Sequence, residues 1–258
     1  MNQGLLWQIT SPHQVVSYIF GTMHIKDLGV IPRVEWALSC LQTVERYYSE
    51  IQMDADPGEM IRFQQLPEGM DVSQLMSEHH YIRLRKSILR SFGMDIHRFR
   101  ALYPLILSNM IQMSILGGTG EEVMDYYLFG IARTAGRDLH YLESQSHQIE
   151  LFQSIPLEYQ INSLTQLGRQ PSKAKKQLVA LVSDYSNGRT RQLYQKSRAQ
   201  LGKMRHMLLY NRNRDMAQTI AADLDLVSGF VSVGAAHLFG YQGLLRLLKK
   251  YGYKIQPL

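Results

Sequence analysis

The chain has 258 residues, of which 45% are hydrophobic and 19% charged, and its formal net charge is +6. This composition is that of an ordinary globular protein and excludes a disordered chain, and the length suits one large α/β domain or one domain with a sizeable insertion. The single cysteine, Cys40, excludes an internal disulfide framework and a Cys-rich zinc module.

Two features of the sequence bear on location. No apolar stretch is long enough to cross a membrane. The first nine residues lack the basic segment and the long apolar segment of a signal peptide. We therefore expect a cytoplasmic protein from the sequence as written, or an exported one if a leader has been removed.

We expect six strands, and they lie in the outer parts of the chain. Each is a short run rich in β-branched and aromatic residues that is bounded by turn residues. They are predicted at 5–9, 15–20, 47–53, 139–142, 229–234 and 253–256. Helices are predicted at 34–44 and 241–250, each of them between two strands.

The middle of the chain has mainly helical periodicity, at 57–136 and 147–226. The glycines at 117–120 lack the Lys-Ser/Thr pair of a phosphate-binding loop, so an inter-helix turn is expected there. Segment 166–215 carries twelve basic residues and only two acidic ones. The basic residues alternate with leucines and tyrosines and accompany no nucleic-acid-binding motif. They predict a solvated helix face, or a lining that attracts an anionic substrate, and no nucleic-acid binding.

One tetrapeptide pattern occurs near both ends of the chain. Gly21-Thr22-Met23-His24 and Gly234-Ala235-Ala236-His237 each follow an apolar, strand-like run. A glycine at a strand end permits a sharp turn, and ligand sites gather at the carboxyl ends of strands in α/β sheets. A lone histidine there usually caps or hydrogen-bonds, but two copies of the same pattern predict two halves of one site.

The order of elements around each motif is strand, helix, strand. It predicts an α/β fold whose central sheet is built from two pseudo-symmetric halves, with the middle helices as a cap or insertion. We expect a single domain that spans residues 1–258.

The predicted strand 47–53 contains Glu50. A carboxylate in such a strand either faces water at a sheet edge or is paired or metal-bound. His24, His237 and Glu50 together match a catalytic metal centre with a position left for water. Zn, Mn, Co and Fe(II) all suit these nitrogen and oxygen ligands.

Two further charged residues are candidates for the same site. Glu143 ends the predicted strand 139–142, and Arg212 lies in a polar patch on an apolar helical segment. Arg212 can hold a substrate carboxylate or stabilise an oxyanion. The alternative is an ordinary ion pair with Glu143 or Asp215.

The chain resembles the TraB/GumN family, which includes the Tiki proteases. The resemblance rests on the two Gly-x-x-His segments, on Glu50, and on further segments in the same order along the chain. These are Leu66-Pro67-Glu68-Gly69, Val123-Met124-Asp125-Tyr126-Tyr127-Leu128, Leu142-Glu143-Ser144 with Gln148, and Arg212-Asn213 followed by Met216-Ala217. The chain departs from the family at Glu122, where glycine is usual, and at Tyr185-Ser186-Asn187-Gly188-Arg189, where the family has a tryptophan and an acid.

The resemblance implies a metal-dependent hydrolase with an α/β fold of two pseudo-symmetric halves, related to erythromycin esterases and haem-binding ChaN proteins. We expect a peptidase-like enzyme that uses a divalent metal ion (Mn, Co or Zn) on a peptide or another amide or ester bond. Glu50 is expected as the third ligand or the general base, with Glu143 and Arg212 orienting ligands or substrate. The alternative is a non-catalytic protein that binds a metal, haem or a small ligand in the same cleft.

Overall fold

The computed structural model describes residues 4–24, 34–54, 57–115 and 123–258. The turn predicted at 117–120 and the departure at Glu122 lie outside these ranges. The described chain divides into two compact units. The first comprises residues up to 53, 118–144 and 181–258, and the second comprises 54–117 and 145–180.

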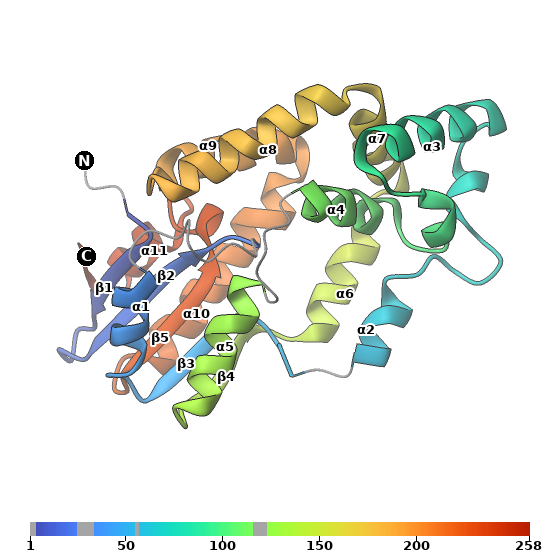
Figure 1. Cartoon of the computed structure of the whole chain (residues 1–258). Coiled ribbons are helices and arrows are strands. Elements are labelled where there is room, and N and C mark those ends of the chain that lie inside the picture. Colours follow the sequence, from blue (N-terminus) through green and yellow to red (C-terminus); the bar gives the residue numbers. More distant parts are fainter. Residues whose placement is uncertain (1–3, 25–33, 55–56, 116–122) are drawn as a thin grey trace. The chain divides into compact units, whose positions relative to one another are not determined.

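The first unit is built on a six-stranded sheet (Figure 1). Its strands are β1 (Leu6–Thr10), β2 (Val16–Thr22), β3 (Arg46–Ile51), β4 (Asp138–Glu143), β5 (Gly229–Gly234) and β6 (Lys254–Pro257). Their order across the sheet is β4-β3-β5-β2-β1-β6. The strands from β4 to β2 are parallel, whereas β1 is antiparallel to both of its neighbours. The predicted α/β class is therefore confirmed.

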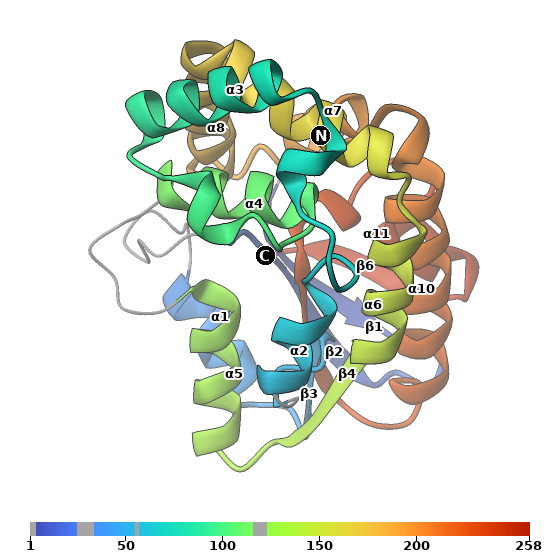
Figure 2. The ribbon, with the colours of Figure 1, turned by 90° about the vertical axis from the view of Figure 1, so that its right-hand side faces the viewer.

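Helices cover both faces of this sheet, as Figure 2 shows. α1 (Val34–Leu41) and α5 (Met124–Thr134) contact one face, while α10 (Arg212–Asp223) and α11 (Leu244–Lys250) lie on the other. The unit also contains α9 (Thr190–Leu201), the short turns Gly202–Met204 and Ala235–His237, and a π-helical turn at His206–Asn211.

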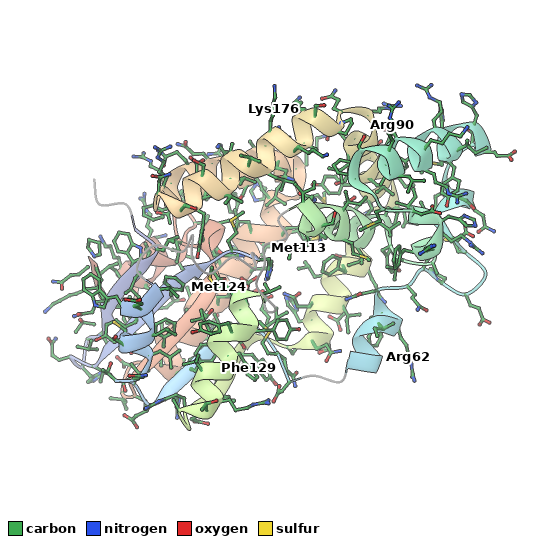
Figure 3. All side chains as sticks on the ribbon, viewed as in Figure 1. Arg62, Arg90, Met113, Met124, Phe129 and Lys176 are labelled. Carbon is green, nitrogen blue, oxygen red and sulfur yellow. The ribbon has the colours of Figure 1, made fainter. Side chains whose placement is uncertain are left out.

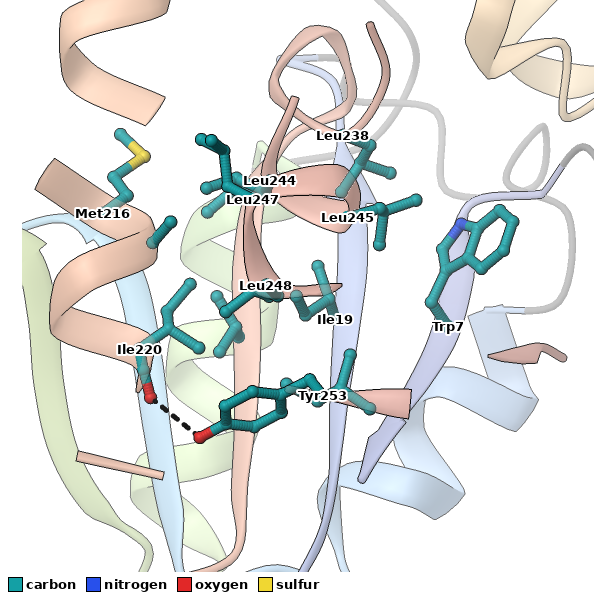
Figure 4. Packing of buried hydrophobic residues seen from close by; sticks show 14 of the residues in the cluster. Trp7, Ile19, Met216, Ile220, Leu238, Leu244, Leu245, Leu247, Leu248 and Tyr253 are labelled. Atoms are coloured by element: carbon teal, nitrogen blue, oxygen red, sulfur yellow. Dashed lines mark hydrogen bonds between the residues drawn. The ribbon is translucent and has the colours of Figure 1, made fainter. Parts of the chain in front are cut away.

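Buried side chains alternate between the two faces of the central strands. Ile19, Val231 and Tyr48 join the core cluster beneath α10 and α11 (Figure 4). On the other face, Tyr47 stacks on the ring of Phe230 at 6.3 Å between ring centroids. Phe129 of α5, labelled in Figure 3, meets Tyr47 edge-on. A strand that is buried on both faces must be apolar at nearly every position, which explains the continuous apolar run of β5.

The second unit is helical. Its elements are α2 (Pro57–Phe63), α3 (Glu78–Phe92), α4 (Pro104–Ile115), α6 (Gln145–Ser154), α7 (Leu157–Arg169), the greater part of α8 (Pro171–Ser186), and short turns at Val72–Leu75 and Ile96–Phe99. Ile88, Ile96, Leu107, Ile111 and Leu164 are completely buried in its separate core. Among the described residues, no helix is long and apolar enough to span a membrane.

Several elements differ from the predicted ones. The helix predicted at 241–250 begins only at Leu244, because Tyr241 and Gln242 form a turn that the Gly243 N–H closes on the Gly240 carbonyl, and the backbone of Gly243 is extended. The helical segments predicted at 57–136 and 147–226 are shared between the units. α5, α9 and α10 belong to the sheet unit, and α5 packs directly on β3 and β4.

Candidate functional site

The two Gly-x-x-His motifs leave the sheet at the carboxyl ends of adjacent strands. In the parallel pair of β2 and β5, Gly21 lies opposite Val233, and Thr22 lies opposite Gly234. These strands are neighbours, as the repeated motif predicts. β3 and β4 deliver Glu50 and Glu143 to the same edge, since all four strands run in one direction.

The two motifs pack directly against each other. A Cβ atom at Gly21 would lie 2.7 Å from Leu238 Cδ1 and 3.2 Å from Ala235 Cβ. A Cβ atom at Gly234 would lie 3.2 Å from Glu50 Oε2. Both glycines thus permit a close approach between segments that any larger residue would push apart.

A network of charges joins Glu50, Arg212 and Glu143. Arg212 Nη2 donates to Glu50 Oε1 at 2.6 Å, and Arg212 Nε donates to Glu143 Oε1 at 2.8 Å. A second bond from Arg212 Nη2 reaches Glu143 Oε2 at 2.8 Å, which makes this pair bidentate. The ion pair with Glu143 that was predicted as an alternative is present. The bond to Glu50 occupies the remaining edge of the guanidinium.

Glu50 is held in its ionised form. Its other oxygen, Oε2, accepts the backbone N–H of Gly234 at 2.7 Å. Burial raises the pKa of Glu50, but His237, Arg212 and the Gly234 N–H outweigh burial and hold that pKa well below its ordinary value. Burial lowers the pKa of His237, while the charges of Glu50 and Glu143 act in the opposite direction.

His237 is oriented by a neighbouring amide. Its Nδ1 atom lies 2.5 Å from Oδ1 of Asn213, the residue next to Arg212 on α10. Its Nε2 atom lies 3.6 Å from Glu50 Oε1. Because the amide oxygen can only accept, it selects the tautomer that carries the proton on Nδ1 and leaves Nε2 with a lone pair.

His24 is oriented in the same manner by a carboxylate. Its Nδ1 atom lies 3.0 Å from Asp125 Oδ2, and Thr22 Oγ1 donates to Asp125 Oδ1 at 2.7 Å. The hydrogen bond to Asp125 raises the pKa of His24 to about 9 against an opposing effect of burial, with smaller contributions from the charges of Asp125 and Glu50. Because 71% of the His24 side chain is exposed, solvent screening weakens this shift.

The first motif is further tied down by Tyr185. This completely buried residue of α8 donates its hydroxyl to the carbonyl of Gly21 at 2.8 Å. It lies in the segment where the chain departs from the family's tryptophan. Arg189, in the position of the usual acid, pairs with Asp184 at 3.6 Å.

All five predicted site residues thus lie at one edge of the sheet, within the first unit. Three partners were missed from the sequence: Thr22, Asp125 and Asn213. Asp125 is only 4% exposed, and a buried acid in the first turn of an apolar helix was the signal that could have identified it.

The nitrogen and oxygen atoms of this site are of the chemical type that binds a divalent metal ion. Both imidazoles bind an oxygen through Nδ1, which leaves the two Nε2 atoms and the anionic Glu50 as nitrogen and oxygen donors. An oxygen partner on the far nitrogen is usual for histidines that ligate a metal. Within the described ranges, no three His, Cys, Asp or Glu side chains already stand in a metal-holding arrangement.

The chain is similar in sequence to a known metalloprotease and to one protein family. The chain is 22% identical to Metalloprotease TIKI2 of Danio rerio over 312 aligned positions. The match covers 97% of this chain and 60% of that protein, so the chain spans well under two thirds of the length of its relative. No solved structure gives a significant match. The sequence model of the TraB/PrgY/gumN family matches residues 5–257, nearly the whole chain, and the chain therefore belongs to the TraB/PrgY/gumN family.

Proposed function

We propose that the chain is a metal-dependent, peptidase-like hydrolase that acts on a peptide or another amide or ester bond. His24 and His237 bind one divalent ion (Mn, Co or Zn) through Nε2, and the two Gly-x-x-His motifs act as equivalent, pseudo-symmetric halves of the site. A metal ion in such a site polarises the scissile carbonyl and lowers the pKa of a bound water to about 7. The similarity to a metalloprotease supports this class of reaction.

One observation carries the proposal. The two histidines come from opposite ends of the chain, yet each has its Nδ1 atom beside an oxygen acceptor, Asp125 or Asn213. This arrangement fixes the ring and directs Nε2 away from its partner.

Glu50 suits the role of ligand better than that of general base. A base that works near neutral pH needs a pKa near that pH, whereas Arg212 and the Gly234 N–H hold the pKa of Glu50 below its ordinary value. Arg212 donates hydrogen bonds to both Glu50 and Glu143. Arg212 thereby positions Glu50, and Glu143 positions Arg212. We therefore assign Glu50 as the anionic third ligand, with Arg212 and Glu143 as positioning residues. The cap formed by the middle helices stays a prediction.

The test begins with the metal itself. The full chain is stripped with a chelator, loaded separately with Mn, Co and Zn, and its metal content is measured by elemental analysis. We expect one ion per chain, and at least a tenfold loss of affinity in His24→Ala and in His237→Ala. Metal binding by either variant that is as tight as that of the wild type would contradict a shared site.

Activity is then measured on mixed peptide and ester libraries, with His24→Ala as the control. Hydrolysis that the chelator abolishes and one of the ions restores is the expected outcome. The competing possibility is a non-catalytic binding protein. It predicts no hydrolysis with any ion, and a Soret absorbance band on addition of haem.

A further inference from the structure

A second polar feature of the sheet unit is a pocket of about 820 Å³ beside the candidate site. Four arginines line it, and none of the described residues that line it is acidic. The arginines are Arg191 and Arg198 of α9, Arg214 of α10 and Arg246 of α11. None of the metal donors or their partners described above contributes to its wall.

Three of these arginines have no carboxylate partner among the residues that the structure describes. Arg246 lies over the ring of Tyr241, with its guanidinium carbon 4.8 Å from the ring centroid. Arg214 donates to the side-chain amide oxygen of Asn211 at 2.5 Å. Arg198 lies near the phenol of Tyr194. All three are exposed and available to a negatively charged ligand.

The wall between these arginines is well packed. Gly240 has a φ of +102°, and a Cβ atom there would lie 2.2 Å from Cζ of Tyr194, so the tyrosine rests directly on the loop backbone. Tyr210 meets His206 edge-on with 5.0 Å between ring centroids. Tyr194 is buried, so this part of the wall loses little further entropy when a ligand binds.

The pocket and the candidate site share structural supports. Asn213, which orients His237, also donates from Nδ2 to the backbone carbonyl of Gln242 at 2.6 Å. Gln242 lines the pocket. On α10, Arg214 of the pocket directly follows Asn213. The pocket is therefore connected to His237 through Asn213, and Phe239 and Gly240 of its wall closely follow His237 in the sequence.

We propose that this pocket binds the carboxylate side chains of an acidic peptide segment, next to the bond that is to be cut. The proposal rests on the proposed function for its connection to cleavage. Arginines match carboxylates with paired N–H donors, and the amides of Gln195, Asn211 and Gln242, which also line the pocket, suit the backbone of a peptide. A nucleic acid fits less well, because proteins bind single strands along a basic groove that follows the backbone.

The test measures binding without turnover. The full chain, kept metal-free with a chelator, is titrated into a fluorescein-labelled peptide rich in Asp and Glu, and into a matched peptide with Asn and Gln instead. Fluorescence anisotropy gives both dissociation constants. We expect the acidic peptide to bind at least tenfold more tightly, with weaker binding as salt rises from 50 to 150 mM. Equal binding of the two peptides would overturn the proposal.

A matched pair of triple variants locates the binding. Arg198→Gln/Arg214→Gln/Arg246→Gln should weaken binding of the acidic peptide at least tenfold. Arg133→Gln/Lys249→Gln/Lys254→Gln removes the same charge from exposed positions of the same unit that lie outside the pocket. The control should stay within twofold of the wild type. An equal loss of affinity in both triple variants would show that only the net charge of the protein matters, and would refute binding in the pocket.

Two further arms separate the alternatives. A labelled single-stranded oligonucleotide is titrated at the same salt, and tighter binding that displaces the peptide would overturn the assignment to a peptide. Hydrolysis of the same peptides by the metal-loaded chain is measured separately. Binding of the acidic peptide without hydrolysis refutes the proposed function and supports the pocket. Hydrolysis at the same rate for the acidic and the neutral peptide supports the proposed function and refutes the role of the pocket.

Discussion

Replacement of Arg212 by methionine tests the charge network at the sheet edge. The change leaves Glu50 and Glu143 without their shared cation, and their side chains are only 21% and 3% exposed. Removal of one partner from a buried ion pair costs about 3–5 kcal/mol. Because Glu50 retains some contact with water, we expect the lower end, a loss of about 3 kcal/mol in the free energy of unfolding. For a chain of this size, that loss lowers Tm by about 6–12 °C.

The assay takes advantage of the two tryptophans, Trp7 and Trp36, which both lie in the sheet unit. Urea unfolding followed by tryptophan fluorescence therefore reports on the unit that contains Arg212. The triple variant Arg212→Met/Glu50→Gln/Glu143→Gln is the control, since it removes all three charges together. We expect it to recover most of the lost stability.

The effect of the Arg212→Met substitution on stability should depend on pH. Arg212 helps to hold the pKa of Glu50 below the ordinary value of 4.5. Its stabilisation is therefore fully present above the pKa of an unfolded glutamate and fades as the pH falls below it. The stability gap between wild type and Arg212→Met should therefore stay nearly constant from pH 7 down to about pH 4.5, and narrow as the pH falls below that value. A gap below about 0.5 kcal/mol at pH 7, the range of an exposed pair, or one that widens in acid, would refute the reasoning.

Three further predictions concern the motifs and their partners. Gly21→Ala should cost about 1–3 kcal/mol through overpacking against the second motif, whereas Gly130→Ala, at an uncrowded helical position, should be neutral or stabilising; the same urea assay compares them. Asn213→Ala should weaken metal binding by about 10–100-fold, measured by competition with a chelating dye; an unchanged affinity would exclude its orienting role. Metal affinity should rise with pH through the raised pKa of His24, because a protonated imidazole cannot ligate. Asp125→Asn should move that rise to lower pH, and a rise at the same pH in both proteins would count against the pairing with His24.

The sequence predicted the bounds of the strands better than it predicted which helices pack on them. The strand predicted at 229–234 has the bounds of β5, and β2 extends only two residues beyond its predicted end. These runs are apolar because both of their faces are buried, which is a local signal. The assignment of α5 to the sheet unit depends on packing between distant segments, which the local periodicity of the sequence does not encode.

The same distinction applies to the site. Glu50, Glu143 and the two histidines follow strands, so a rule about strand ends brings them together. Asp125 lies 101 residues beyond His24 in a helix, and no local pattern connects the two. For Arg212 the sequence offers both substrate binding and an ion pair with Glu143 or Asp215. The additional bond to Glu50 could not be predicted, because Glu50 and Glu143 become neighbours only once β3 and β4 pair.

The place of β5 between β2 and β3 has a consequence for how the protein is made. When β2 and β3 leave the ribosome, the strand that fits between them is still nearly two hundred residues away. Until it arrives, each has an unpaired edge, and such edges favour association with other chains. Long-range strand pairing is slow, and β5 must pair with both β2 and β3 before His237 reaches the sheet edge that carries His24 and Glu50. A nascent or truncated chain therefore contains most of the sheet but none of the completed site.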